Sequence, residues 1–211
     1  MTERLLCICA HNDDHVIGAG GTIAKFAAQG AIVKVVCFSF GELSHPHLKP
    51  EVIAHRRIQE SLTANKILGM KGIVYLGVKE HEFVKERDVL IKKLARLIEE
   101  EKPTLVFTHA CDDPHPEHRI VNSIVRELVQ QKIISCDAYE FPVWNLSRLR
   151  LRNVPRLVID ITDTFDVKIK SFAAHKSQLV TMWTLLWNVY LRSRLAGLRR
   201  GIRYAEVFYK I

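Results

Sequence analysis

Residues 4–22 read RLLCICAHNDDHVIGAGGT, which is a short apolar run, a polar cluster and a glycine-rich segment. The apolar run, residues 4–10, predicts a buried β-strand. The glycine-rich segment GAGG, residues 18–21, then opens a helix that continues to about Gln29 and ends at Gly30. A buried strand, a polar loop and a helix in this order are typical of the first unit of a parallel α/β sheet.

The rest of the 211-residue chain repeats this alternation of strands and helices. Further strands are expected at residues 31–39, 72–76, 104–108, 137–143 and 156–161. Helices are expected at residues 50–68, 88–101, 118–132 and over most of 166–195. This order predicts an α/β fold of three layers with a mainly parallel sheet, in a single domain that spans residues 1–211.

Two clusters of histidine and acidic residues follow the first and fourth predicted strands. The first reads HNDDH, residues 11–15, and the second reads HPEH, residues 115–118. Because a site in such a fold lies outside the carboxyl ends of the strands, we expect the two clusters to lie together. Two imidazoles and one carboxylate suit zinc and leave it a position for water. The clusters therefore predict an open catalytic zinc site.

Five residues of the two clusters can be given roles in such a site. We expect His11, Asp14 and His118 to hold one zinc ion per chain. Asp13 is then free to act as the general base on water, and His115 could donate a hydrogen bond or a proton to the oxyanion or the leaving group. Capping and surface polarity usually explain isolated pairs of this kind, but the recurrence at equivalent strand ends favours the metal.

The glycine-rich segment admits two interpretations. It resembles a loose phosphate-binding loop, but its match to GxGxxG is incomplete and an acidic turn precedes it. A tight, closely packed turn from loop to helix is the better explanation.

The run AHNDDHVIGAGGT, residues 10–22, resembles the AHPDDE-x-x-GxGGT signature of the LmbE/PIG-L family of zinc-dependent N-deacetylases. HPEH, residues 115–118, resembles that family's HPDH motif. The similarity includes the preceding TH at 108–109 and Asp113, and it extends to RR-x-x-E at 56–60, AHKSQ at 174–178 and YAEVF at 204–208. It therefore covers nearly the whole chain, with the paired metal motifs in the family's order.

The resemblance implies a Rossmann-like fold of the LmbE type and a metal-dependent hydrolase. Its substrate would be an N-acetylglucosamine-type amino-sugar conjugate, a small molecule from which an acetyl group is removed. The family pattern gives the zinc ligands, the base and the assisting histidine the same positions as the chemical argument above. It also implies that an arginine of the second helix, Arg56 or Arg57, contacts the substrate.

Three residues depart from the family pattern. Asn12 replaces a proline, and Glu117 replaces an aspartate that is not a ligand. His15 replaces the motif glutamate, so a substrate contact there could differ, or the added imidazole could itself bind zinc. The alternative function is accordingly a protein of the LmbE fold that binds metal and sugar with altered catalysis.

The net charge of +8 comes largely from the last third of the chain, whose arginines include Arg148, Arg150, Arg152, Arg192, Arg194, Arg199, Arg200 and Arg203. No zinc-finger, RNP-type or helix-turn-helix pattern accompanies them, so we expect no nucleic-acid partner. An anionic substrate or a membrane surface would explain the charge equally well.

The segment 182–204 carries an aromatic, apolar helix face ahead of these arginines. This pattern favours a helix that packs in the core or against another subunit, so a homo-oligomer is expected. Contact with anionic lipid is the alternative.

The compartment is predicted from three further features. No apolar stretch has the length of a membrane span, and the run at residues 4–10 is too short for a signal peptide. The five cysteines form no CxxC pair and no even disulfide framework. We therefore expect a cytoplasmic protein.

Overall fold

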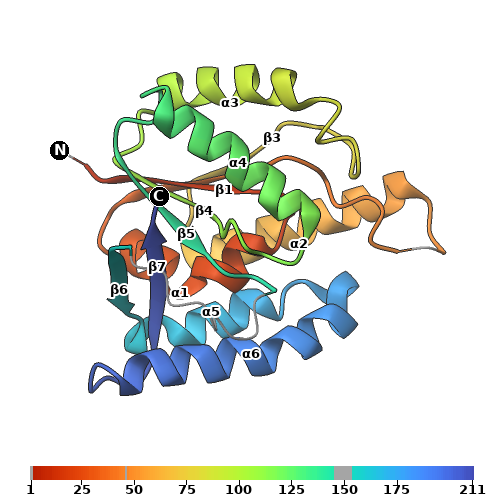
Figure 1. Ribbon diagram of the computed structural model, residues 1–211. Coiled ribbons are helices and arrows are strands. Elements are labelled where there is room, and N and C mark those ends of the chain that lie inside the picture. Colours follow the sequence, from red (N-terminus) through yellow and green to blue (C-terminus); the bar gives the residue numbers. More distant parts are fainter. Residues whose placement is uncertain (1, 46, 145–153) are drawn as a thin grey trace.

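The computed structural model describes residues 2–45, 47–144 and 154–211. Within them a seven-stranded sheet lies between two layers of helices (Figure 1). The strands are β1 (Arg4–Cys9), β2 (Ile32–Cys37), β3 (Gly72–Tyr75), β4 (Leu105–His109), β5 (Asp137–Phe141), β6 (Arg156–Asp160) and β7 (Ala205–Lys210). The α-helices are α1 (Asp14–Ala28), α2 (Pro50–Leu68), α3 (Arg87–Glu101), α4 (Pro116–Gln130), α5 (Phe165–Phe172) and α6 (Leu179–Leu198). The predicted α/β fold with a mainly parallel sheet is confirmed.

The strands follow the order β3-β2-β1-β4-β5-β7-β6 across the sheet. The first five in this order pair in parallel, and β7 pairs antiparallel with both β5 and β6. The chain moves outward through β2 and β3 on one side of β1 and returns to β4 on its other side. Such a reversal opens a crevice at the carboxyl ends of the two central strands, which is where ligands bind in open α/β sheets.

Alternating side chains of β1 divide the core into two halves. Leu6 and Ile8 pack with buried residues of α3 and α4, whereas Leu5 and Cys7 pack with buried residues of α1, α2, α5 and α6. Figure 1 shows the same division, with α3 and α4 on one face of the sheet and the other four α-helices on the opposite face. Because both faces are covered, the central strands consist almost entirely of apolar residues.

Helix α1 begins earlier than its sequence predicts. Gly18, Gly20 and Gly21 lie inside the helix, which starts at Asp14, so the prediction of a glycine-rich turn is wrong. The close packing expected there is real. A Cβ on Gly18 would lie 2.0 Å from the Phe141 ring, and one on Gly21 would lie 2.7 Å from the Ile161 side chain. The glycines let α1 approach the sheet closely enough to place its first turn at the strand ends.

Strand β7 is the element that sequence analysis missed. Its buried residue Glu206 accepts hydrogen bonds from the backbone N–H groups of Gly21 and Thr22 at 3.1 and 2.8 Å. The Glu206 carboxylate also pairs with the ammonium group of Lys168 from α5, and Lys168 is fully buried. This pair ties α1, α5 and β7 together directly behind the glycine segment.

The helical region expected over residues 166–195 is divided in the structure. Helix α5 is followed by a short 3-10 turn, η2 (Lys176–Gln178), and then by α6. No helix within the described residues combines the length and the apolar character needed to cross a membrane.

A candidate metal centre beside an open pocket

The candidate site lies where β1 and β4 end. His11 and Asp13 occupy the loop after β1, and Asp14 is the first residue of α1. His115 directly precedes α4, whose first residue Pro116 is preorganised for a helix start, and His118 lies in the first turn of α4. The parallel pairing of β1 with β4 brings these two loops to the same edge of the sheet. The predicted meeting of the two clusters is therefore found.

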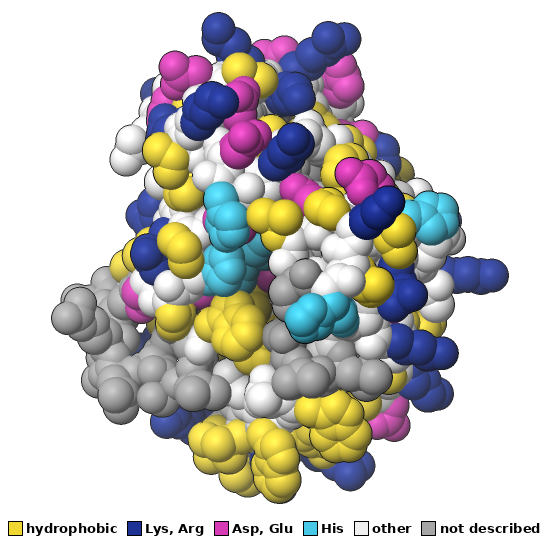
Figure 2. All heavy atoms as spheres, turned by 90° about the vertical axis from the view of Figure 1, so that its right-hand side faces the viewer, with side chains coloured by type: hydrophobic (Ala, Val, Ile, Leu, Met, Phe, Trp, Pro, Cys, Tyr) yellow, Lys and Arg dark blue, Asp and Glu magenta, His cyan; other side chains and the backbone are white. Residues whose placement is uncertain are grey.

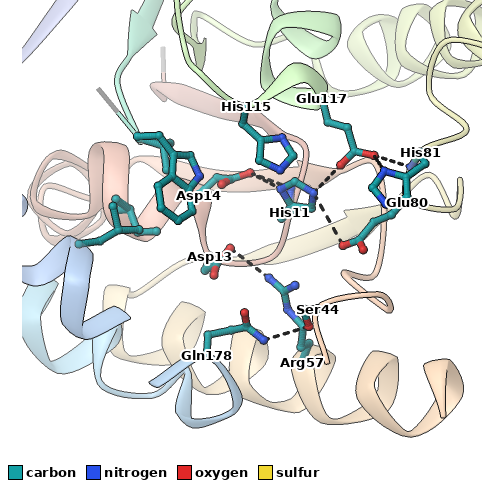
Figure 3. Close-up of a pocket in the computed structure, with 14 residues that line it drawn as sticks. His11, Asp13, Asp14, Ser44, Arg57, Glu80, His81, His115, Glu117 and Gln178 are labelled. Carbon is teal, nitrogen blue, oxygen red and sulfur yellow. Dashed lines mark hydrogen bonds and ion pairs between the residues drawn. The ribbon is translucent and has the colours of Figure 1, made fainter. Parts of the chain in front are cut away.

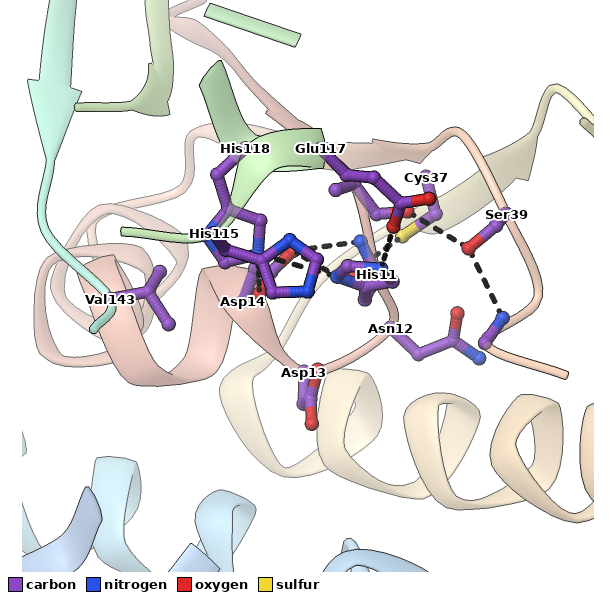
Figure 4. Close-up of polar contacts among 12 residues, drawn as sticks. His11, Asn12, Asp13, Asp14, Cys37, Ser39, His115, Glu117, His118 and Val143 are labelled. Carbon is purple, nitrogen blue, oxygen red and sulfur yellow. Dashed lines mark hydrogen bonds and ion pairs between the residues drawn. The ribbon is translucent and has the colours of Figure 1, made fainter. Parts of the chain in front are cut away.

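Three side chains converge at the centre of this edge (Figure 4). The His118 Nε2 atom lies 3.3 Å from the nearer Asp14 oxygen and 3.3 Å from His11 Nδ1. The second Asp14 oxygen lies 3.6 Å from His11 Nδ1. One ligand atom from each residue falls within 4.8 Å of the other two, and all three residues are buried. Two imidazoles and one carboxylate at this spacing fit a zinc ion with three protein ligands.

A second carboxylate, that of Asp113, orients His118 for this role. The Asp113 Oδ1 atom lies 3.1 Å from His118 Nδ1, so a proton of the ring is held on Nδ1 and the Nε2 atom is directed toward Asp14. The other oxygen of Asp113 accepts the backbone N–H groups of Val143 and Trp144. Burial disfavours the charged carboxylate, but the hydrogen bond and the charge of His118 lower the pKa of Asp113 to about 2.

His109, the last residue of β4, packs beside Asp14 and accepts the backbone N–H of Ala10 at 3.0 Å. Its Nε2 lies 3.2 Å from Asp14 Oδ2, and its ring stacks on the His118 ring with centroids 3.9 Å apart. Burial and the neighbouring His118 lower the pKa of His109 to about 4. Burial opposes the charge on Asp14, yet the adjacent His118 and His109 hold the pKa of that carboxyl well below its usual range. Neither Asp113 nor His109 was assigned a role by the sequence.

A pocket of about 230 Å³ opens beside these residues (Figure 3). Its walls come from both clusters and from loops that the sequence did not single out. The lining residues are His11, Asp13, Asp14, Ile17, Ser44, Arg57, Glu80, His81, His115, Glu117, Val143, Trp144, Gln178 and Leu185. Two of the candidate metal ligands, His11 and Asp14, line the pocket together with Asp13 and His115, so a bound molecule would meet these four residues directly.

The two arginines proposed for substrate contact occupy different environments. Arg57 is buried and lines the pocket, where its Nη2 donates to Asp13 Oδ1 over 3.1 Å and its Nη1 donates to the Gly41 carbonyl. Gly41 has a φ of +71°, and a Cβ there would lie 2.1 Å from the Arg57 guanidinium. Arg56 is exposed and is not a lining residue. Of this pair, only Arg57 reaches the site.

Glu117 links the metal ligands to the pocket rim. Its Oε2 lies 2.8 Å from His11 Nε2, and its Oε1 accepts the backbone N–H of His81, a non-glycine residue with a φ of +70°. Burial disfavours the charged His11 ring, but hydrogen bonds to Asp14 and Glu117 raise the pKa of His11 to about 10. The methylene that distinguishes glutamate from the family aspartate is thus accommodated.

The His115 ring contacts two of the candidate metal ligands. Its centroid lies 5.0 Å from that of the His11 ring and 4.5 Å from that of the His118 ring. Burial and the charges of His118 and His11 lower its pKa to about 4. The ring therefore faces the pocket as a neutral imidazole that has one N–H to donate.

His15 points away from this arrangement. It is fully buried, its Nε2 lies 2.8 Å from Asn65 Oδ1 on α2, and burial lowers its pKa. It does not line the pocket. Among the described residues the possible metal ligands form two groups, His11 with Asp14 and His118, and His11 with His115 and Glu117, and His15 belongs to neither. His15, the main departure from the family motif, thus lies at the contact between α1 and α2 and not at the pocket, where a substrate contact was expected.

The fold and the site together define an α/β enzyme with a candidate metal centre at the carboxyl edge of its sheet. Comparison with known families identifies it further. The chain belongs to the PIG-L family, described as GlcNAc-PI de-N-acetylase, whose profile matches residues 6–129. The resemblance seen in the sequence motifs is confirmed.

Individual relatives agree in fold and differ in activity. The diacetylchitobiose deacetylase of Thermococcus kodakarensis is 29% identical, covering 97% of this chain and 81% of the relative. The solved structure of N,N'-diacetylchitobiose deacetylase from Pyrococcus horikoshii superposes with a TM-score of 0.82 at 26% identity, over 99% of this chain and 84% of that one. The 4-oxalmesaconate hydratase of Pseudomonas putida is 27% identical, over 95% of this chain and 81% of the relative.

Proposed function

We propose that this protein is a zinc-dependent hydrolase that removes the acetyl group from an N-acetylated amino sugar. The observation that carries the proposal is the buried group of His11, Asp14 and His118, beside which Asp13 faces an open pocket. This set has the composition of a catalytic zinc site, and a further carboxylate is available for proton transfer. Both deacetylases named above, one by sequence and one by structure, support the reaction.

The three ligands would hold the ion by His11 Nδ1, an Asp14 oxygen and His118 Nε2, the atoms that face one another. When bound, zinc supplies a Lewis acid for the amide carbonyl and for water. Asp113 would hold the His118 proton on Nδ1, so that Nε2 is the atom available to a metal, and His109 lies against Asp14. The chain thus fixes the direction of its ligands before anything binds.

Asp13 would remove the proton from the attacking water. Its carboxylate lines the pocket and is not needed as a ligand, because Asp14 fills that position. Arg57 holds one oxygen of Asp13 and leaves the other for a proton. A base held by a buried cation keeps one orientation, which is what proton transfer at hydrogen-bond distance requires.

His115 would act on the other side of the scissile amide. Its ring lies over His11 and His118 and lines the pocket, so its N–H can donate to the oxygen of the tetrahedral intermediate. As that intermediate collapses, the proton taken by Asp13 passes to the departing amine. The net reaction is an amide and water giving acetate and a free amine.

The remaining pocket residues suit a small polar ligand. Ser44, Gln178 and Glu80 offer hydroxyl, amide and carboxylate groups to sugar hydroxyls, and Trp144 offers an aromatic face. The Gln178 amide already donates to the Ser44 hydroxyl over 2.9 Å, so the two form one hydrogen-bonding wall. This mixture favours an amino sugar as the small-molecule partner.

The test is release of acetate and of a free amine by the purified, zinc-loaded chain. A panel of N-acetylglucosamine compounds, free, nucleotide-linked and lipid-linked, should contain at least one substrate that gives the two products in equal amounts. The metal-free chain should give neither product. If zinc and an N-acetyl sugar bind without turnover, the alternative of a binding protein with altered catalysis replaces the proposal.

Because one relative is a hydratase, a second assay is needed. It should measure the addition of water to the double bond of 4-oxalmesaconate, the compound for which that relative is named. Hydration in the absence of amide cleavage would assign the site to a lyase instead.

We also propose a cytoplasmic location. It is supported by the five cysteines, all of which are free thiols, and three of them, Cys7, Cys9 and Cys37, are buried in the core. Unpaired thiols of this kind are typical of a reducing compartment.

A further inference from the structure

Helix α6 exposes an apolar face that no described part of the chain covers. The exposed fractions are 81% for Trp187, 65% for Trp183 and 57% for Leu191. Leu195 and Leu198 continue the exposed apolar surface toward the end of the helix. Figure 2 shows hydrophobic side chains gathered at the lower end of the molecule, at the height of α6 in Figure 1. Packing of α6 in the core therefore accounts for only its opposite face, through Leu185 and Val189.

The segment that carries this face has charged side chains of one sign only. The sequence holds no aspartate or glutamate from residue 167 to residue 205. Arg194, Arg199, Arg200 and Arg203 are exposed at the carboxyl-terminal end of α6 and just beyond it. Arg192 differs, because its guanidinium turns inward to the carbonyls of Pro142 and Ile17. Arg148, Arg150 and Arg152 lie outside the described residues.

We propose that the exposed face of α6 docks on an anionic lipid surface. Trp183 and Trp187 would enter the headgroup region, where an indole can bury its ring and keep its N–H solvated. Arg194, Arg199 and Arg200 would contact lipid phosphates. A helix with aromatic and leucine residues on one face and arginines beside them is the pattern of a helix that lies in the plane of a membrane interface.

A second copy of the chain fits this face less well. Its own α6 would bring the same arginines and no carboxylate from residues 167–205 to neutralise them. Burying unpaired guanidinium groups between two subunits carries a large desolvation cost. Lipid phosphates supply the missing negative charge and leave the arginines at the aqueous boundary, so charge complementarity favours the membrane.

The docking helix is also part of the pocket wall, because Leu185 of α6 lines the pocket. Docking would therefore hold the pocket next to the lipid surface. This docking is independent of the proposed hydrolase function, and its test needs neither zinc nor turnover.

The experiment is co-sedimentation of the full chain with vesicles of phosphatidylcholine alone or mixed equally with phosphatidylglycerol. We expect binding to the mixed vesicles only, with a blue shift of tryptophan fluorescence and weaker binding as salt is raised. The double variant R199A/R200A should bind about 30-fold more weakly, because each arginine near an anionic membrane contributes about five-fold. The matched control K92A/R96A removes the same charge from α3, on the opposite face of the sheet, and should bind normally.

A second variant, W183S/W187S, tests the apolar part of the surface. It should weaken vesicle binding on the order of ten-fold or more, with unchanged circular dichroism, because both side chains are exposed. Equal binding to neutral and anionic vesicles, or none to either, would overturn the proposal. So would a stable dimer that W183S/W187S dissociates and that does not bind vesicles, since the face would then belong to a second copy.

Discussion

Asp113 Oδ1 lies 3.1 Å from His118 Nδ1 and 3.0 Å from the backbone nitrogen of His115. One oxygen therefore positions both His118, a proposed metal ligand, and His115, which is proposed to assist the tetrahedral intermediate. The same carboxylate also holds the backbone N–H groups of Val143 and Trp144, which wall the pocket. The site is organised around a residue that touches neither the metal position nor the pocket.

We predict that D113N weakens zinc binding by about 10- to 100-fold, as is typical when the partner of a metal-binding histidine is lost. The asparagine keeps the shape of the side chain but no longer offers two acceptor oxygens. Competition with a chelator measures the effect, and D112N, at the exposed neighbouring position, is the matched control. If the two variants bind zinc equally well, Asp113 does not orient His118.

The neighbouring arginines give a matched pair of variants. We predict that R57M lowers kcat/KM about 100-fold, because Asp13 loses the buried cation that fixes its orientation. R56M should leave kcat/KM unchanged, because Arg56 is exposed away from the pocket. Steady-state kinetics on the same substrate compare the two variants. R57K, which keeps the positive charge beside Asp13, is the control for misfolding of R57M. Equal effects of R56M and R57M would remove Arg57 from the site.

The sequence could predict the strand–helix alternation and the meeting of the two clusters, because both depend on local periodicity and strand direction. It could not distinguish Arg56 from Arg57, because the choice depends on how α2 is rotated against α1. The same rotation turns His15 toward Asn65, which no motif reveals. Asp113 lies within the second motif region, but its further contact with Val143, 30 positions later in the chain, depends on the tertiary fold.

The error at the start of α1 has a similar cause. Glycines usually interrupt helices, so the segment 18–21 predicted a turn, whereas here close packing against the sheet requires glycine inside the helix. Strand β7 was missed because it pairs antiparallel with strands formed far earlier in the chain. Its register depends on tertiary contacts such as the one between Glu206 and the start of α1.

We predict that G18A destabilises the fold by roughly 1–3 kcal/mol, because its Cβ would overlap the fully buried Phe141 ring. G72A is the control, since a Cβ there meets nothing within 4 Å. Urea unfolding measures both free energies. If G18A is as stable as G72A, the close approach of α1 to β5 is not what requires the glycine.

A pH-dependent prediction concerns the buried pair of Lys168 and Glu206. Burial favours the neutral amine and, although Glu206 opposes the shift, the pKa of Lys168 falls from 10.5 to about 8. Between pH 8 and pH 10.5 the folded protein binds fewer protons than the unfolded chain. The contribution of Lys168 to the free energy of unfolding therefore rises as the pH increases through this range. Below pH 8 that contribution no longer changes.

The unfolding free energy of the natural chain minus that of K168M isolates this contribution. We expect the difference to grow by roughly 2–3 kcal/mol between pH 7.5 and 10.5, following the conversion of pKa shifts to free energy. Urea titrations at several pH values provide the measurement. A difference that stays constant or decreases over this range would contradict the depressed pKa.

The most direct test of the proposed hydrolase is to measure acetate release and zinc content together, for the natural chain and for D13N. We predict that the natural chain with one zinc ion releases acetate from an N-acetyl amino sugar. D13N should keep its zinc and lose on the order of 10²–10⁴-fold in turnover, the usual loss when a general base is removed. Zinc-loaded natural chain that releases no acetate from any N-acetyl amino sugar would contradict the account. Loss of zinc from D13N would show that Asp13, not Asp14, is the ligand.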